Sequence, residues 1–409
     1  MSEGDARHAA EAAARRSYGR LLSLIARSTR DIAAAEDALA DAFAEALRVW
    51  PERGVPDRPE AWLLTAARRA AGHARRHQGV RDSAAPALEQ VYEAMQSRTT
   101  PEFPDERLKL MFVCAHPAID ETVRTPLILQ TILGLDAARI ARAFLVEAPA
   151  MSQRLVRAKA KIRDAGVAFE VPDTSALQER LEDVLAAIYA AYTLGWDDVP
   201  GEAAADERLT EEAIFLARLV VMLLPQEPEA KGLLALMLAS EARAPARRGH
   251  AGAYIPLKDQ DVGLWNAALI AEAEACLRSA AMLSRPGRFQ TEAAIQSLHN
   301  QSVMQGNVPA SALLMLYDVL VRQSPAIGAA VARAAAYGEH RSAEEGLARL
   351  GEIPEARVET YHPYWAARFH LLQAAGRLNE AAQAHAKAIS LTRDPALIAF
   401  LTSRLIKPE

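Results

Sequence analysis

The segment Arg139–Gly166 constrains the fold of this chain more than any other part of the sequence. Its second half carries one apolar stripe, because apolar residues recur there at intervals of 4, 3 and 4: Met151, Leu155, Ala158 and Ile162. Polar and basic side chains occupy most of the remaining positions. The pattern predicts an amphipathic helix with a basic solvent-facing side.

A shorter helix and a tight turn precede that helix. Asp136 is placed to cap the shorter helix, and Ile140 and Phe144 supply its buried face. Residues 145–147 are expected to form the turn, and Pro149 suits the first turn of a helix, where its missing N–H is not needed. This is the layout of a helix-turn-helix whose second helix enters the major groove of DNA. The alternative is an amphipathic helix whose basic face contacts only solvent.

The composition favours packed helices over sheets. Hydrophobic residues make up 51% of the 409 residues and aromatic residues only 6%, so we expect an all-α chain. No apolar run approaches the roughly 20 residues that span a bilayer, and the N-terminus lacks the apolar segment of a secretory signal. The two cysteines, Cys114 and Cys276, cannot form a disulfide framework. We therefore expect a cytoplasmic protein with no membrane contact.

Composition and charge divide the chain into four parts. Residues 1–80 form a helical domain, with helix over Tyr18–Trp50; residues 81–104 form a polar linker; residues 105–170 end in the predicted helix-turn-helix. Residues 171–409 form a helical extension in which small residues around Gly338 and Gly376 recur at about the period of tetratricopeptide repeats. Residues 1–170 have a net charge of +2 and the extension has −7, so a nucleic-acid partner fits only the front of the chain.

Two charged helices lie in the first domain. In the stretch Leu63–Arg81 the pairs Arg68/Arg75 and Arg69/Arg76 are each seven residues apart, so they stack on one side of a helix and suit phosphate contacts. The alternative, a solvated surface helix, would normally mix charge signs. The preceding helix carries an acidic ridge of side chains without basic partners: Glu36, Asp37, Asp41 and Glu45. Such a ridge becomes useful if a basic partner surface docks on it.

No motif supports catalysis or a cofactor. His73 and His77 have a spacing that could ligate zinc, but no third ligand is in sight, so we expect no metal site. Cys114 and His116 stand in an apolar context, where core packing is a better explanation than a nucleophile. Phosphate-binding and dinucleotide-binding glycine motifs are absent from the sequence. We expect a protein that is not an enzyme.

The order of these features resembles that of the extracytoplasmic-function (ECF) sigma factors of bacterial RNA polymerase, and most closely the group with a large tetratricopeptide-like C-terminal extension. The similar stretches are AEDALADAFAEALRVWPERGVPDRPEAWLLTAARR, DERLKLMFVCAHPAI, RIARAFLVEAPAMSQRLVRAKAKIRDAGVAFEVP and LKDQDVGLWNAALIAE. The resemblance implies two helical domains, region 2 and region 4, before the extension. It also implies a factor that recruits core RNA polymerase to promoters.

The resemblance assigns roles to individual residues. Four would grip the clamp helices of the polymerase β′ subunit: Glu36, Asp37, Asp41 and Phe43. Five would engage the −10 promoter element: Trp62, Arg68, Arg69, Arg75 and Arg76. Six would contact the −35 element: Ser152, Gln153, Arg154, Arg157, Lys159 and Lys161. The resemblance also implies contact with the β flap and leaves room for a regulatory protein on the extension.

Two stretches depart from the family pattern. In the −10 helix, Ala71 and Ala74 replace bulky core residues, and Gly72 costs about 1 kcal/mol relative to alanine in mid-helix. Residues 193–196 read Thr-Leu-Gly-Trp where the group carries Asn-Glu-Gly-Tyr. We therefore expect a loosely packed −10 helix and an altered regulatory contact. The alternative function is a DNA-binding regulator or repeat scaffold that no longer binds polymerase.

Overall fold

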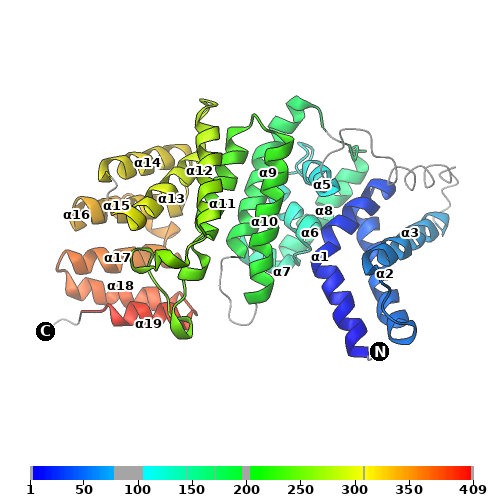
Figure 1. Cartoon of the computed structure of the whole chain (residues 1–409), viewed down its shortest axis with the longest axis horizontal. Coiled ribbons are helices and arrows are strands. Elements are labelled where there is room, and N and C mark those ends of the chain that lie inside the picture. The colour runs from blue at the N-terminus through cyan, green and yellow to red at the C-terminus, as the bar shows by residue number, and fades with distance from the viewer. Residues whose placement is uncertain are drawn as a thin grey trace. The chain divides into compact units, whose positions relative to one another are not determined.

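The chain folds into helices throughout the part that the structure describes (Figure 1). The structure is a computed structural model that describes residues 3–77, 105–144, 146–170, 172–195, 203–306 and 309–406. These residues form no strand, which confirms the predicted all-α fold class. Contacts divide the chain into two compact units, Met1–Leu194 and Gly195–Glu409. The predicted linker, residues 81–104, lies outside the described residues.

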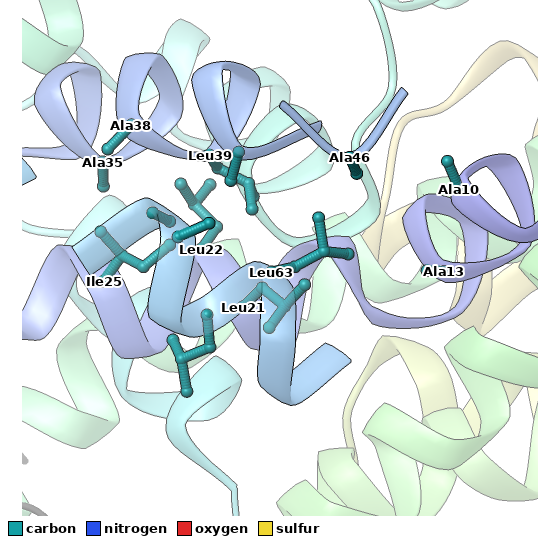
Figure 2. Packing of buried hydrophobic residues seen from close by; sticks show 14 of the residues in the cluster. Ala10, Ala13, Leu21, Leu22, Ile25, Ala35, Ala38, Leu39, Ala46 and Leu63 are labelled. Carbon is teal, nitrogen blue, oxygen red and sulfur yellow. The ribbon is translucent and has the colours of Figure 1, made fainter. Parts of the chain in front are cut away.

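The first unit holds the segments expected to contact polymerase and DNA. Its described helices are α1 (Glu3–Thr29), α2 (Ile32–Arg53), α3 (Pro59–His77), α5 (Glu106–Cys114), α6 (Glu121–Leu133), α7 (Ala137–Ala143), α8 (Ala148–Asp164) and α9 (Thr174–Leu194). Helices α1, α2 and α3 enclose one core, in which Leu21, Leu22 and Ile25 of α1 meet Leu39 of α2 and Leu63 of α3 (Figure 2). Alanines fill the space between these larger side chains, so the helices approach closely.

The helical stretch expected over Tyr18–Trp50 is interrupted at Arg30. This residue adopts a left-handed φ of 55°. The Asp31 side chain then accepts hydrogen bonds from the N–H groups of Ala33 and Ala34, at 2.9 and 3.2 Å. An aspartate at this position satisfies backbone donors that a helix start leaves unpaired, so a new helix begins. Apolar periodicity continues on both sides of the break and does not reveal it.

Aspartate caps also begin three helices of the second half of the unit. Asp105, Asp120 and Asp136 accept backbone hydrogen bonds at the starts of α5, α6 and α7, which confirms the predicted cap at Asp136. The four residues of the predicted apolar stripe on α8 are all buried, as expected: Met151, Leu155, Ala158 and Ile162. Phe144 ends α7, and Leu145 of the predicted turn lies outside the described residues.

Helix α9, the first helix of the predicted extension, packs within the first unit. Arg124 on α6 forms an ion pair with Asp183 on α9, with 2.8 Å between Nη1 and Oδ2. The Arg180 guanidinium donates a hydrogen bond to the carbonyl oxygen of Phe112 on α5 at 3.1 Å. The compact first unit therefore continues to Leu194. The four predicted parts, with their boundaries, stay predictions.

The second unit is a succession of helices and short 3₁₀ turns. Its α-helices are α10 (Ala203–Leu223), α11 (Pro228–Glu241), α12 (Ala267–Ala281), α13 (Arg288–Gln305), α14 (Ala310–Gln323), α15 (Ile327–His340), α16 (Ala343–Gly351), α17 (His362–Ala374), α18 (Leu378–Ser390) and α19 (Pro395–Ser403). Small residues lie where helices cross: a Cβ on Gly338 would lie 2.1 Å from Cδ2 of Leu371. Among the described residues no helix is long and apolar enough to span a membrane.

The stretch between α11 and α12 ties the unit to its last helix. Arg248 forms an ion pair with Asp394 at 2.9 Å, and the ring of Tyr254 packs edge-on against Phe400 of α19. Trp265 is buried, and Asn266 caps α12 through hydrogen bonds from Ala268 and Leu269. The similar stretch LKDQDVGLWNAALIAE thus forms 3₁₀ turns and the start of a helix within the unit.

Candidate nucleic-acid interface

The acidic ridge of α2 has two sides. Asp37, Asp41 and Glu45 are exposed along one face of the helix, and Leu47 is an exposed apolar side chain elsewhere on the same helix. Phe43 is half-buried against the core of α1–α3, so it contributes to packing as well as to the surface. An exposed acidic face is suited to a basic protein partner.

Glu36 lies on the other side of the ridge and faces α8. Its Oε2 atom lies 2.5 Å from the Nζ atom of Lys159, and the Lys159 side chain is only 8% exposed. A candidate polymerase-binding residue and a candidate DNA-binding residue therefore bind each other. The sequence assigned Glu36 and Lys159 to separate surfaces, and those assignments stay predictions that require this ion pair to separate.

The first half of α3 is anchored in the core. The indole ring of Trp62 packs edge-on against Trp50, with 5.5 Å between ring centroids. Arg68 is half-buried, and this burial lowers the pKa of its guanidinium group, whereas Arg69 is exposed. The side chains of Arg75 and Arg76 lie outside the described residues.

Residues 70–72 of α3 are all small. A Cβ on Gly72 would meet nothing within 4 Å, apart from the helix itself. Ala71 contacts the core only as a partly buried residue. Ala71 and Gly72 are small residues where the family that the chain resembles has larger ones, and at Gly72 the described neighbours leave space for a side chain. The altered −10 recognition expected from them stays a prediction.

Most candidate −35 residues form one exposed surface on α8. Five of the six are exposed: Ser152, Gln153, Arg154, Arg157 and Lys161. Arg157 donates a hydrogen bond to the side-chain oxygen of Gln153 at 3.2 Å, so these two side chains already lie side by side. A depression of about 440 Å³ separates α8 from the start of α6, and Arg154, Arg157 and Lys161 line it together with Thr122. Such a surface can contact both phosphates and base edges.

Val156 belongs to this surface although the sequence analysis did not select it. Its side chain is 63% exposed, on the helix between Gln153 and Arg157. An exposed branched apolar side chain among these polar groups is suited to contact the methyl group of thymine. The sequence could have indicated it, because an apolar residue that lies off the apolar stripe of a helix is expected to be exposed.

The residues considered for catalysis and metal binding do not converge. Cys114 is fully buried and lies 3.5 Å from the hydroxyl of Thr131, and burial raises the pKa of its thiol to about 12. The His116 ring accepts a hydrogen bond from the N–H of Ala118 instead of contacting Cys114. Within the described ranges, no group of three or more His, Cys, Asp or Glu residues could hold a metal ion.

Comparison with known proteins adds to this geometry. Residues 13–81, which include α2 and α3, match sigma-70 region 2, and residues 180–281 match a family of unknown function (DUF6596). An uncharacterized protein of Rhizobium meliloti (strain 1021) is 35% identical over 392 residues, which are 94% of this chain and 92% of the relative. The chain belongs to the sigma-70 family, with a large C-terminal extension. No solved structure matches it.

Membership of the sigma-70 family implies two kinds of partner for the chain. Proteins with region 2 act in transcription initiation by binding core RNA polymerase and promoter DNA, and the family is one of non-enzymatic transcription factors. Region 2 covers the acidic face of α2 and the basic helix α3. The chain therefore carries both of these charged surfaces in one three-helix core.

Proposed function

We propose that this chain is an ECF-type sigma factor of the cytoplasm. It docks on the β′ clamp helices of core RNA polymerase through α2, engages the −10 element through α3, and reads the −35 element through α8, with a further contact at the β flap. The observation that carries the proposal is the exposed row of polar and basic side chains on α8, in a chain whose first domain matches sigma-70 region 2.

Two features of the first domain support the polymerase contact. The carboxylates of Asp37 and Asp41 are exposed one helical turn apart. The core beneath them is closely packed, with Leu39 and Trp50 fully buried, so the exposed carboxylates are held on a rigid helix. A preorganised acidic face loses little conformational freedom when a basic partner binds.

The −35 contact follows from the chemistry of α8. Gln153 and Arg157 lie together on the exposed face, and amide and guanidinium groups can form paired hydrogen bonds with adenine and guanine, each worth about 1–3 kcal/mol of discrimination. Arg154 and Lys161 flank them and suit phosphate contacts. The helix thus combines groups that position DNA with groups that specify its sequence.

Run-off transcription with purified core polymerase tests this function. The full chain is expected to direct initiation at the promoter upstream of its own gene, and Arg157→Ala is expected to reduce the transcript at least tenfold. Arg142→Ala removes a cation from the exposed surface of α7 and serves as the matched control. Polymerase binding without a transcript from any candidate promoter would refute promoter-directed initiation.

One observation favours a second candidate function. A Cβ on Gly72 would meet nothing within 4 Å among the described residues, and glycine inside α3 weakens a helix that a sigma factor needs for the −10 element. On this alternative, the chain is a DNA-binding regulator or a tetratricopeptide-like scaffold that does not bind polymerase. A pull-down with purified core polymerase separates the two functions, because only a sigma factor is retained.

We also propose that the extension regulates the factor in cis or through a partner protein. The support is the charge distribution, since residues 171–409 carry a net charge of −7 and residues 1–170 carry +2. A chain ending at Leu194 keeps α9 and the whole first unit, so it is the appropriate truncation. It is expected to bind promoter DNA more tightly than the full chain; equal affinity at low salt would exclude electrostatic masking.

A further inference from the structure

The second unit contains a cavity that the proposed function does not use. Its volume is about 290 Å³, close to the lower end of the range of about 300–1,000 Å³ that is typical of small-molecule sites. The short 3₁₀ turn η3 (Leu257–Asp259) and the helices α13, α14 and α15 contribute to its wall. A cavity of this size is suited to a ligand of the size of an amino acid.

Part of the wall of this cavity is apolar. Leu298 and Val303 of α13 and Leu313 of α14 contribute branched aliphatic side chains, and Pro256 and Leu257 add apolar surface at η3. Leu313 also belongs to the core that α13, α14 and α15 share, so the aliphatic wall is held by the packing of the unit. Burial of apolar surface against this wall is favourable, so a fitting ligand carries an apolar group.

Two side chains of opposite charge line the same cavity. Lys258 lies on η3 and Glu339 on α15, and both are exposed. They form no ion pair with each other or with another of the described residues. Two opposite charges that line one cavity without neutralising each other match a ligand that carries both a carboxylate and an ammonium group.

The turn that carries Lys258 is tied to the rest of the unit. The N–H of Asp259 donates a hydrogen bond to the carbonyl oxygen of Pro256 at 2.9 Å, and the Asp259 carboxylate lies 3.5 Å from the guanidinium group of Arg404. The side chain of Gln260 donates a hydrogen bond to the carbonyl oxygen of Ile255 at 3.3 Å. Because the backbone is held in this way, less conformational freedom is lost when a ligand binds.

A histidine adds a hydrogen-bonding group to the wall without adding a charge. The Nε2 atom of His299 lies 2.9 Å from the hydroxyl oxygen of the buried Tyr317. Burial lowers the pKa of the His299 imidazole and raises the pKa of Tyr317 to about 12, so both groups are neutral at neutral pH. The Nδ1 atom of His299 makes no hydrogen bond to the described residues, which leaves it for a polar group of the ligand.

We propose that this cavity binds a small apolar amino acid. Lys258 pairs with the carboxylate of the ligand, Glu339 pairs with its ammonium group, and the aliphatic wall receives its side chain. The proposal concerns the second unit alone and does not depend on the sigma function. An extension with such a site responds to the concentration of the amino acid, because binding stabilises the liganded form.

Calorimetric titration of the full chain tests the class of ligand. Leucine, methionine and phenylalanine are the probes, and at least one of them is expected to bind. Two analogues of the tightest probe each lack one charged group; for leucine these are 4-methylpentanoate, without the ammonium group, and 3-methylbutylamine, without the carboxylate. Each analogue is expected to bind at least about tenfold more weakly than the amino acid. No binding of the three amino acids at millimolar concentration, or an analogue that binds as tightly as its parent, would overturn the proposal.

Two variants assign the charges of the ligand to their partners. Glu339→Gln is expected to weaken binding of the amino acid at least about tenfold and to leave the weak binding of the carboxylate analogue unchanged, because that analogue has no ammonium group. Lys258→Gln is expected to weaken the amino acid similarly and to leave the amine analogue unchanged. Retained binding of the analogue excludes misfolding as the cause.

Matched controls remove exposed charges of the same signs elsewhere in the unit. Glu359→Gln and Arg357→Gln change residues that do not line the cavity, so both are expected to bind the amino acid like the wild type. Wild-type affinity for the amino acid in Glu339→Gln or in Lys258→Gln would overturn the proposed site.

Discussion

Gly19 on α1 and Ile132 on α6 approach so closely that a methyl group on Gly19 would lie 1.9 Å from the Ile132 carbonyl oxygen. Gly19→Ala is therefore expected to destabilise the packing of α1 on α6 by about 1–3 kcal/mol, since neither backbone can move without disturbing its helix. Hydrogen exchange of peptides from α1 and α6 measures this change locally. Unchanged protection in both helices would show that the contact is not required.

Gly72 on α3 gives the opposite expectation for the same substitution. A Cβ there meets nothing within 4 Å, so Gly72→Ala adds helix propensity without steric conflict. We expect α3 to become more stable by about 0.5–1 kcal/mol, measured by slower hydrogen exchange of its amides. If promoter opening improves with it, the glycine limits −10 recognition. A loss of protection would contradict the open space at Gly72.

The stability of the first unit should depend on the titration of Glu36. Burial raises the pKa of its carboxyl group above the ordinary 4.5, and Lys159 opposes this rise. The other titratable groups that interact electrostatically with it are Tyr18, Asp31, Asp37 and Cys114. Because the folded-state pKa is the higher one, Glu36 contributes stability that is present below pH 4.5 and is lost as pH rises through the raised pKa.

A comparison of wild type with Glu36→Gln isolates this contribution. The urea midpoint of each chain is measured by hydrogen exchange of peptides from α2 and α8. As the pH rises above 4.5, the midpoint of Glu36→Gln is expected to rise relative to that of the wild type. Glutamine keeps the shape of the side chain and can still accept a hydrogen bond from Lys159. A difference that is constant from pH 4.5 to 8 would contradict the direction of the pKa shift.

The two thiols should differ in reactivity. Burial raises the pKa of Cys114 to about 12, so only about one molecule in ten thousand carries its thiolate at pH 8. Cys276 is only partly buried. Iodoacetamide is expected to label Cys276 in the native chain and Cys114 only after unfolding in urea. Preferential native labelling of Cys114 would contradict its packing against Thr131.

Val156 provides a test of base reading that leaves the fold intact. Because its side chain is 63% exposed, Val156→Ala is expected to change the free energy of unfolding by less than about 0.5 kcal/mol. Replacing thymine by uracil in the −35 element removes one methyl group and is expected to weaken binding of the wild type but not of Val156→Ala. Equal sensitivity of both chains to uracil would exclude the methyl contact.

The sequence predicted those features that depend on local periodicity and capping. The apolar stripe of α8 and the cap at Asp136 follow from residues within a few positions of each other. The pairing of Glu36 with Lys159 joins residues 123 positions apart, and both appear from their own helices as surface charges. Lys159 follows Ala158 at the edge of the apolar stripe. Whether its side chain is buried therefore depends on α2, which packs against this edge and carries Glu36.

Local sequence patterns also do not predict which of the two units α9 packs in. Its apolar face would suit either unit, and its attachment to the first one depends on Arg124, Asp183 and Arg180 across three helices. The sequence was sufficient to predict the charge of each candidate surface, basic on α8 and acidic on α2, because that charge follows from the residues of one helix. Which members of each set share one surface required the structure.

Affinity for purified core RNA polymerase tests the central claim most directly. The full chain is expected to bind it, and the double variant Asp37→Asn/Asp41→Asn is expected to bind about tenfold more weakly, because both exposed carboxylates lose their charge without a change of shape. Glu52→Gln, at an exposed position near the end of α2, should bind like the wild type. No binding by the wild type, or equal binding by all three chains, would contradict a sigma factor that docks through α2.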